Sequence, residues 1–156
     1  MIFPFVILAL LAGTELSEAI AVQRKVTLAS RATADLTTQY ITMSNSDISN
    51  VLAASAAIIA PYSAGNFSVT ISEVSMDSTG KATVTWSRSL NGTPLNAGQT
   101  VSIPGNINQP NTSLILGQVA YTYVPRFGYR AVGTKVLSDQ IFMSPRLVNS
   151  IALTGS

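Results

Sequence analysis

Residues 1–44 read MIFPFVILALLAGTELSEAIAVQRKVTLASRATADLTTQYITMS, with no proline after Pro4 and no glycine after Gly13. Proline and glycine are the residues that most often end a helix, so this segment predicts one continuous helix from about Phe3 to Ser44. At 1.5 Å per residue such a helix would be roughly 60 Å long. A chain of 156 residues does not need a helix of that length to form a globule. We therefore expect its first third to project and the remainder to pack on a domain.

The projecting third, Met1 to Thr14, carries no charged side chain. As a helix it covers roughly 21 Å, whereas the hydrocarbon core of a bilayer needs about 30 Å. It lacks the basic start and the cleavage pattern of a signal peptide. We interpret it as part of a membrane helix with about six to eight further residues before Met1, and a buried core helix is the alternative. The apolar residues of this membrane or filament-core segment are Phe3, Phe5, Val6, Ile7, Leu8, Leu10 and Leu11.

A second pattern runs along the rest of the predicted helix. Mostly apolar residues recur at intervals of alternately four and three, which places them on one helical face. We expect this stripe to pack against the domain or against another helix. Its residues are Val22, Val26, Ala29, Thr33, Leu36, Tyr40 and Met43.

Two acidic and two basic residues follow the apolar segment. Glu15 and Glu18 share a helix face, and Arg24 and Lys25 come shortly after them. Two carboxylates act in general acid–base catalysis only in a pocket that shifts a pKa, so we expect no catalytic role. Salt bridges between subunits and a plain solvated face are equally compatible with this spacing.

A second, shorter helix is predicted after Ser46, which could cap it, with Asp47 in its first turn. Pro61 ends this helix. Beyond it the hydrophobic period changes to two, which indicates strands. We expect a hairpin around the turn Asp77 to Gly80, with Ala82, Val84 and Trp86 alternating on its second strand.

Two further strands are predicted, from Leu114 to Tyr123 and from Lys135 to Met143. Residues 91–109 read as a loop, residues 126–133 as a connection with aromatic side chains, and the end of the chain as a small polar tail. Helices followed by strands predict an α+β fold, with a short helix packed on a roughly four-stranded antiparallel sheet. The division that we expect is a long helix over residues 1–44 and a globular head over residues 45–156.

Composition excludes several classes of function. The chain contains no Cys and no His. It can therefore form no disulfide, no zinc site with those ligands and no catalytic arrangement that needs imidazole or thiolate. We expect no enzyme activity, no cofactor, no metal and no small-molecule substrate. The net charge of +2 comes from only 10% charged residues, too few for the clustered basic face of a nucleic-acid-binding protein.

Four segments in order carry a resemblance to a known family. They are GTELSEAIAVQRKVTLASRATADL (13–36), NVLAASAAIIAPY (50–62), PNTSLILGQVAYTYVP (110–125) and DQIFMSPR (139–146). In this succession the chain resembles the TadE-like pilins or pseudopilins of the tight-adherence (Tad) type IV pilus.

The resemblance implies a structural subunit of a bacterial filament. The N-terminal helix would hold it in the inner membrane with its head in the periplasm, and assembly would carry it into an extracellular pilus used in adhesion. Its partners would be copies of itself or other pilins. In that family a peptidase cuts after a Gly and a Glu five residues on guides assembly; neither lies ahead of the apolar segment here, and Glu15 is too late for that role.

Two other functions remain open at this point. A membrane-anchored envelope module could recognise a surface glycan or ligand through its sheet. An envelope hydrolase is disfavoured by the lack of His and Cys. Sequence does not separate a major filament subunit from a minor or tip subunit.

Overall fold

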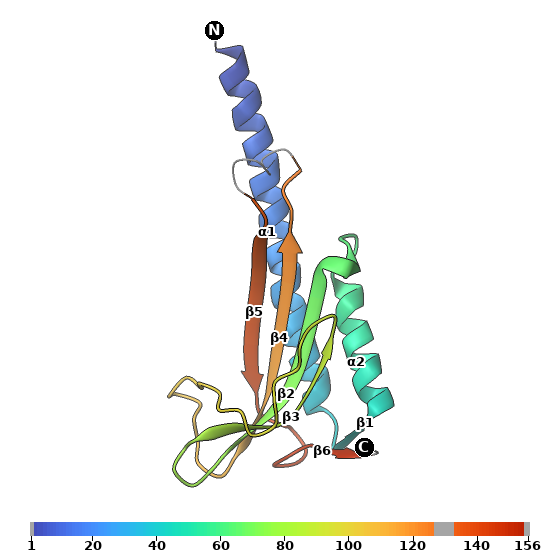
Figure 1. Ribbon diagram of the computed structural model, residues 1–156, viewed down its shortest axis with the longest axis vertical. Coiled ribbons are helices and arrows are strands. Elements are labelled where there is room, and N and C mark those ends of the chain that lie inside the picture. The colour runs from blue at the N-terminus through green and yellow to red at the C-terminus, as the bar shows by residue number, and fades with distance from the viewer. Residues whose placement is uncertain (1, 127–132, 155–156) are drawn as a thin grey trace.

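A computed structural model describes residues 2–126 and 133–154 of the chain. One long helix projects from a head made of a shorter helix and a sheet, as Figure 1 shows. The predicted connection 126–133 lies outside the described residues except at its ends. The elements in chain order are α1 (Phe3–Thr38), β1 (Thr42–Ser44), α2 (Asn45–Ile58), a 3₁₀ turn η1 (Ala64–Asn66), β2 (Phe67–Met76), β3 (Ala82–Leu90), β4 (Ser113–Tyr123), β5 (Lys135–Met143) and β6 (Ala152–Thr154).

The main sheet has four strands in the order β3-β2-β4-β5, all antiparallel. Helices α1 and α2 pack on one face of it. This confirms the predicted α+β fold. The period of two expected beyond Pro61 is seen in β2, where Phe67, Val69, Ile71 and Glu73 lie on the buried face. The second half of α1 is part of the same core, because Val22 and the residues that follow it on that face are buried against the sheet.

The sheet also buries apolar residues on its other face. There the loop between β3 and β4 covers a second cluster through Leu95, Val101, Ile103 and Ile107. The cluster consists of Val74, Met76, Ala82, Val84, Leu114 and Leu116.

A β-bulge explains how β3 supplies residues to both faces. The pairing of β2 with β3 shifts between Glu73, opposite Trp86, and Val74, opposite Val84, which leaves Thr85 as the extra residue. An extra residue moves every later side chain to the opposite face. Trp86 therefore packs with the helices, while Val84 and Ala82 join the second cluster. The prediction that these three residues share one face is wrong for this reason.

Helix α1 ends at Thr38, so the prediction that it continues to Ser44 is wrong. The chain leaves the helix because Thr42–Ser44 pairs in parallel with Ala152–Thr154 of β6, a contact between distant parts of the sequence. The Thr38 carbonyl accepts a hydrogen bond from the Arg146 backbone N–H at 3.1 Å, which fixes the helix end. Tyr40 and Met43 consequently lie beyond the helix.

The extended strand β1 also determines where α2 begins. Ser44, not Ser46, caps α2: its Oγ accepts from the Asp47 N–H at 3.2 Å, and an Asp47 carboxylate oxygen accepts from the Ser44 N–H at 2.9 Å. This reciprocal pair is a capping box, which satisfies two backbone donors at once. Its Ser must be extended, as Ser44 is at the end of β1.

The C-terminal segment is tied into the core at Ile151, which is fully buried. Its N–H donates to Glu73 Oε1 at 2.8 Å, and its carbonyl accepts from Trp86 Nε1 at 2.8 Å. Arg146, earlier in the same segment, forms an ion pair with Asp35 of α1. The predicted small polar tail therefore has a structural part that the sequence analysis did not foresee: residues 146–154 contact the end of α1 and pair with β1 through β6.

Helix α1 approaches the sheet most closely at Gly117 of β4. A Cβ atom at this position would lie 2.8 Å from the Ser30 carbonyl oxygen and 3.2 Å from Ala34 Cβ. Glycine within a strand often marks such a close approach of another backbone. The absence of a side chain at position 117 lets the helix lie flat on β4.

We expect Gly117→Ala to lower the free energy of unfolding by about 1–3 kcal/mol, since the helix backbone must move away from the strand. Gly105→Ala is the control, because nothing lies within 4 Å of a Cβ built there. Denaturant unfolding of the full chain in detergent measures both. Equal effects of the two substitutions would show that the helix is not in contact with β4 at this point.

The capping box predicts a pH dependence. Hydrogen bonds from the Ser44 hydroxyl and then the Ser44 N–H hold the Asp47 pKa below its ordinary value of 3.8. A carboxyl with a lowered folded-state pKa stabilises the fold above the unfolded pKa and loses this effect as the pH falls through the folded value. The stability difference between the native chain and Asp47→Asn should therefore be largest near neutral pH and shrink below pH 3.8.

Unfolding of both chains across this pH range in the same detergent tests the expectation. Asp77, whose pKa is also lowered by hydrogen bonds from Thr79 and Lys81, is present in both chains and cancels in the difference. A difference that stays constant with pH would contradict the role given to the Asp47 carboxylate.

Candidate functional site

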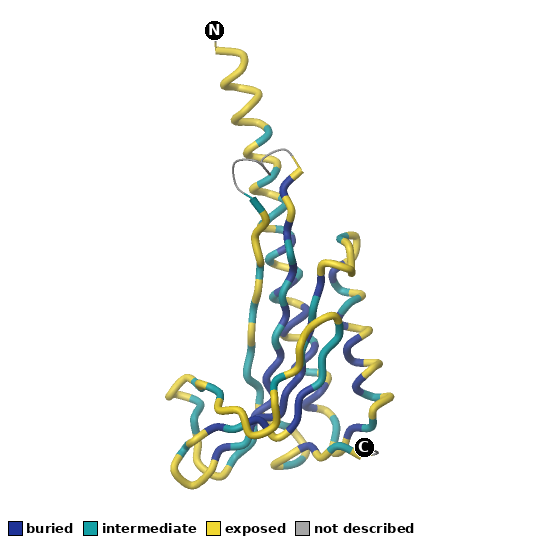
Figure 2. The backbone as a smooth tube through the Cα atoms, viewed as in Figure 1, coloured by how far each residue is buried: buried dark blue, intermediate teal, exposed yellow. Residues whose placement is uncertain are grey.

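The N-terminal part of α1 is an apolar surface that the described residues of the head leave uncovered. Phe3, Leu8 and Leu10 are 76%, 62% and 67% exposed, and Leu11 is half-buried. Figure 2 shows this exposed stretch projecting beyond the head. The exposed residues of the predicted membrane or filament-core segment are Phe3, Phe5, Val6, Ile7, Leu8 and Leu10. A contiguous apolar surface of this kind marks a contact with a membrane or a protein partner.

The local sequence makes this segment suitable for surroundings without water. Pro4 lies in the first turn, where its missing N–H costs no helical hydrogen bond. The hydroxyls of Thr14 and Ser17 donate to the carbonyls of Leu11 and Gly13 at 2.8 and 2.9 Å. Polar groups are thus satisfied within the helix, as a nonaqueous environment requires. Helix α1 is long and apolar enough to cross a membrane.

The predicted packing stripe lies partly in the head's own core. Val22, Val26, Ala29 and Thr33 are fully buried, and the Thr33 hydroxyl is 2.5 Å from Ser55 Oγ of α2. Leu36 is instead 36% exposed.

The stripe departs from the predicted spacing for a geometric reason. A strict seven-residue repeat needs 3.5 residues per turn, whereas a straight helix has 3.6 and drifts by about 20° per heptad. Two heptads after Val22 the drift amounts to about 40°, which leaves Leu36 at the edge of the buried face, while Thr37 beside it is fully buried. Tyr40 lies beyond the end of α1 and so does not continue the stripe as part of the helix, but it packs half-buried against the same core.

The four charged candidates lie where α1 meets the head. Glu18 Oε1 is 3.9 Å from the Arg126 guanidinium, and Lys25 Nζ donates to the Ile58 carbonyl at 3.1 Å. Arg24 is exposed on the outer side of the helix, and Glu15 has its backbone carbonyl 3.3 Å from the Tyr123 hydroxyl. Contacts of these charges with another subunit stay a prediction.

Tyr123 shares this junction. Burial, followed by the negative charges of Glu18 and Glu15, raises the pKa of its hydroxyl, because the phenolate form would be poorly solvated and repelled. Tyr123 therefore remains a neutral hydrogen-bond donor at the base of the projecting helix.

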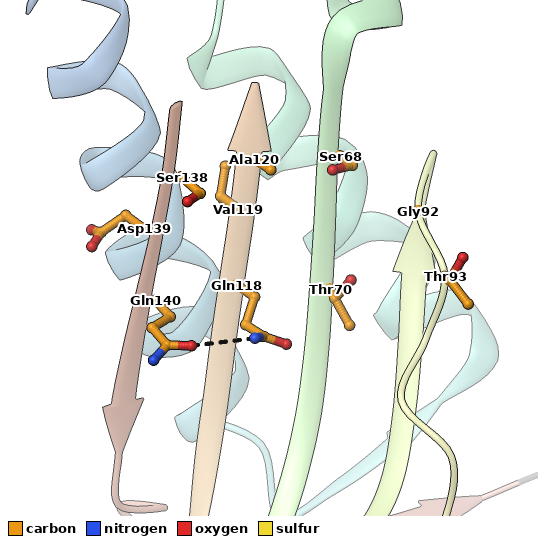
Figure 3. Close-up of a pocket in the computed structure, with 10 residues that line it drawn as sticks. All are labelled: Ser68, Thr70, Gly92, Thr93, Gln118, Val119, Ala120, Ser138, Asp139 and Gln140. Carbon is orange, nitrogen blue, oxygen red and sulfur yellow. Dashed lines mark hydrogen bonds between the residues drawn. The ribbon is translucent and has the colours of Figure 1, made fainter. Parts of the chain in front are cut away.

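A hollow that sequence reasoning missed lies on the sheet face away from the helices. It encloses about 550 Å³ between β5 and the loop after β3, and we call it the sheet hollow. Figure 3 shows its side chains, which come from three strands of the main sheet, β2, β4 and β5, and from the loop after β3. The lining residues are Ser68, Thr70, Gly92, Thr93, Gln118, Val119, Ala120, Ser138, Asp139 and Gln140.

The sheet hollow is lined mostly by amides, hydroxyls and small side chains. Gln118 Nε2 donates to Gln140 Oε1 at 3.3 Å, as Figure 3 shows. Asp139, the only charged residue of the lining, accepts from the Ser30 hydroxyl at 2.9 Å and so turns its carboxylate toward α1. The alternation of small polar residues on the outer sides of β2, β4 and β5 was the sequence signal for this surface.

The described part of the chain contains no group of side chains suited to binding a metal ion. Among residues 2–126 and 133–154, no three side chains of the types His, Cys, Asp and Glu gather where they could hold a metal ion. Buried Glu73 is engaged in fixing the C-terminal segment through Ile151.

Comparisons of the chain with protein-family models, curated proteins and solved structures give no match. The fold itself resembles that of a type IV pilin, since a long apolar N-terminal helix packs with its second half on a four-stranded antiparallel sheet. This likeness concerns architecture alone.

Replacing an apolar residue of α1 by glutamate should have a different effect on the buried face of the helix than at its exposed edge. Val26→Glu should lower the free energy of unfolding by about 3 kcal/mol or more, because it buries a carboxylate where Val26 is 0% exposed. Leu36→Glu should cost less than about 1 kcal/mol. Denaturant unfolding in detergent distinguishes them, and equal losses would mean that Leu36 belongs to the packed stripe after all.

Proposed function

We propose that the chain is a TadE-like pilin or pseudopilin, a structural subunit of an extracellular Tad-type pilus that acts in pilus assembly and surface adhesion. One observation carries the proposal: α1 consists of an exposed apolar half and a half buried in the head. A single rigid helix thus joins a segment that needs surroundings without water to a head that does not.

This division suits a subunit that exists in two environments. In the inner membrane the apolar half of α1 would be surrounded by lipid, with the head in the periplasm. In the filament the same surface would pack against the helices of neighbouring copies or other pilins. Both environments exclude water, so one apolar surface serves both.

The Tad assignment is finer than the architecture and rests on the ordered segments 13–36, 50–62, 110–125 and 139–146. Arg24 on the open side of α1 would be available for an acidic residue of another subunit. A non-enzymatic role is supported by a sequence without His or Cys.

Filament formation should depend on the exposed apolar half. We expect Leu8→Glu to reduce the amount of assembled filament at least tenfold, because a carboxylate in a packed apolar core must be desolvated. Ile41→Glu is the matched control, since Ile41 on the head is 58% exposed and Leu8 is 62% exposed. Mass spectrometry of sheared, purified filaments measures the abundance of each variant.

Three results would bear against the proposal. Finding the chain only in the inner membrane and never in filaments would reject it and favour the anchored binding module. Equal abundance of the Leu8→Glu and native chains in filaments would show that the apolar half does not hold copies together. Equal loss with Ile41→Glu would show a nonspecific effect of the added charge.

A further inference from the structure

A small apolar pocket lies where the head meets the exposed half of α1, and we call it the junction pocket. It encloses about 240 Å³ between α1 and the adjoining ends of β4 and β5. Figure 1 shows these strand ends beside the middle of α1. An engineered apolar cavity of about 150 Å³ holds a benzene molecule, so the junction pocket has room for several methylene groups. Its apolar lining residues are Ala12, Leu16, Ala19, Pro125 and Leu137.

The position of the junction pocket along α1 corresponds to the surface of a membrane. Residues 3–14 carry no charge, and Glu15 is the first ionisable side chain after them. The hydrocarbon of a bilayer that surrounds this segment therefore ends near Glu15. The lining from Ala12 to Ala19 covers about 10 Å of helix, and a headgroup layer is about 5–8 Å thick. The pocket thus extends from the edge of the hydrocarbon into the headgroup layer.

Side chains typical of a membrane interface gather at the same level. Tyr123 lines the junction pocket, and Tyr62 and Tyr121 line a neighbouring pocket together with it. Tyrosine is enriched where hydrocarbon meets water, because its ring is apolar and its hydroxyl is polar. Val124 and Val136, which adjoin lining residues in the chain, are 47% and 66% exposed. This apolar rim is continuous with the exposed half of α1 and favours an occupant that comes from the bilayer.

One charged side chain of the junction pocket is available to a ligand. Lys135 is exposed, and no described residue forms a hydrogen bond or an ion pair with its ammonium group. A lysine binds phosphate as a point charge, so Lys135 is placed to bind the phosphate of a lipid headgroup. Glu15 lines the same pocket and would repel a purely anionic headgroup. A headgroup with an ammonium group beside its phosphate fits both charges.

We propose that the junction pocket binds one zwitterionic phospholipid of the membrane around α1. Part of an acyl chain lies against Leu16, Ala19 and Leu137, and the phosphate pairs with the Lys135 ammonium group. This inference rests on the proposed function, because the pocket meets lipid only while the exposed half of α1 is in the membrane. Such a lipid joins the head to the bilayer at a second point, beside the helix itself.

Photolabelling from the lipid tests the site. The full chain is placed in vesicles of phosphatidylethanolamine in which a small fraction of the lipid carries a diazirine near the glycerol end of one acyl chain. Light joins the diazirine carbon to the residue that it touches, and mass spectrometry of tryptic peptides locates the adduct. Residues 136–146, a tryptic peptide that contains Leu137, should be labelled. Residues 82–88 of β3, a peptide of the same chain away from the pocket, should not.

A larger side chain at the pocket separates the site from general proximity to the bilayer. Ala12→Phe should lower the labelling of residues 136–146 about fivefold or more, because the ring occupies the space of the acyl chain. Ala9→Phe is the matched control, since Ala9 is also an exposed alanine of α1 but does not line the pocket. Equal labelling of the native and Ala12→Phe chains would overturn the inference.

The headgroup contact has its own test. Lys135→Gln should lower the same labelling about fivefold, the effect expected for one basic residue at a lipid surface. Lys81→Gln should leave it unchanged, because Lys81 is an exposed lysine in the turn between β2 and β3, at the other end of the head (Figure 1). Diacylglycerol with the same diazirine chain lacks the phosphate and should label residues 136–146 less. Equal labelling by diacylglycerol would overturn the role given to Lys135.

The outcomes separate this inference from the proposed function. Unlabelled residues 136–146 in a chain that still forms filaments in cells would overturn the lipid site and leave the pilin function intact. Labelling in a chain that never appears in filaments would support the lipid site and contradict the pilin function. No labelling, together with disulfide-linked dimers in a mixture of Phe5→Cys and Leu137→Cys chains, would assign the pocket to the helix of a second copy instead.

Discussion

Exposure of the apolar half of α1 to water is the constraint on which the rest of the structure depends. Burying one large apolar side chain is worth about 1.5–3 kcal/mol, so the exposed residues from Phe3 to Leu10 together represent on the order of 10 kcal/mol. The described part of the head does not supply that cover, because β4 and β5 lie along the second half of α1 (Figure 1). In the proposed function lipid or the helices of other subunits supply this cover, and the second half of α1, packed in the core, holds the helix on the head. Three contacts position the elements of the head: the close approach of α1 to Gly117, the contact of Thr33 with Ser55, and the hydrogen bond between Ile151 and Glu73.

The scarcity of charged residues fits the same need for contacts that exclude water. Only 10% of the residues are charged, and several of those carry out tasks within the chain: Asp47 caps α2, Asp35 pairs with Arg146, and Glu73 binds the Ile151 N–H. The exposed surfaces of α2 and of the outer sheet are left to alanine, serine, threonine and glutamine. Such surfaces carry few charges that would have to be desolvated on contact with a neighbour, which is consistent with the proposed filament subunit.

Local patterns in the sequence predicted the elements, and contacts between distant residues determined where the predictions failed. The apolar run, the period of two and the turn at Asp77 identified α1, the four main strands and their α+β arrangement. The pairing of β1 with β6 follows the end of α1 at Thr38, and the bulge at Thr85 places Val84 on the other face of the sheet. Neither feature can be recognised from a short window of sequence. The heptad reading failed at Leu36 because a straight helix has 3.6 residues per turn. The exposed apolar site followed from composition alone, whereas the sheet hollow required the register of β2, β4 and β5 and the path of the loop after β3.

The central claim is that the exposed half of α1 meets other helices and that its second half belongs to the head. A helical reconstruction by electron cryomicroscopy of filaments containing this chain tests it most directly. The account predicts density for residues 3–14 packed around the filament axis against the same segment of other subunits, with residues 22–38 held on their own sheet. Density that places residues 3–14 on the water-facing surface of the filament, or that detaches residues 22–38 from their own sheet, would contradict it.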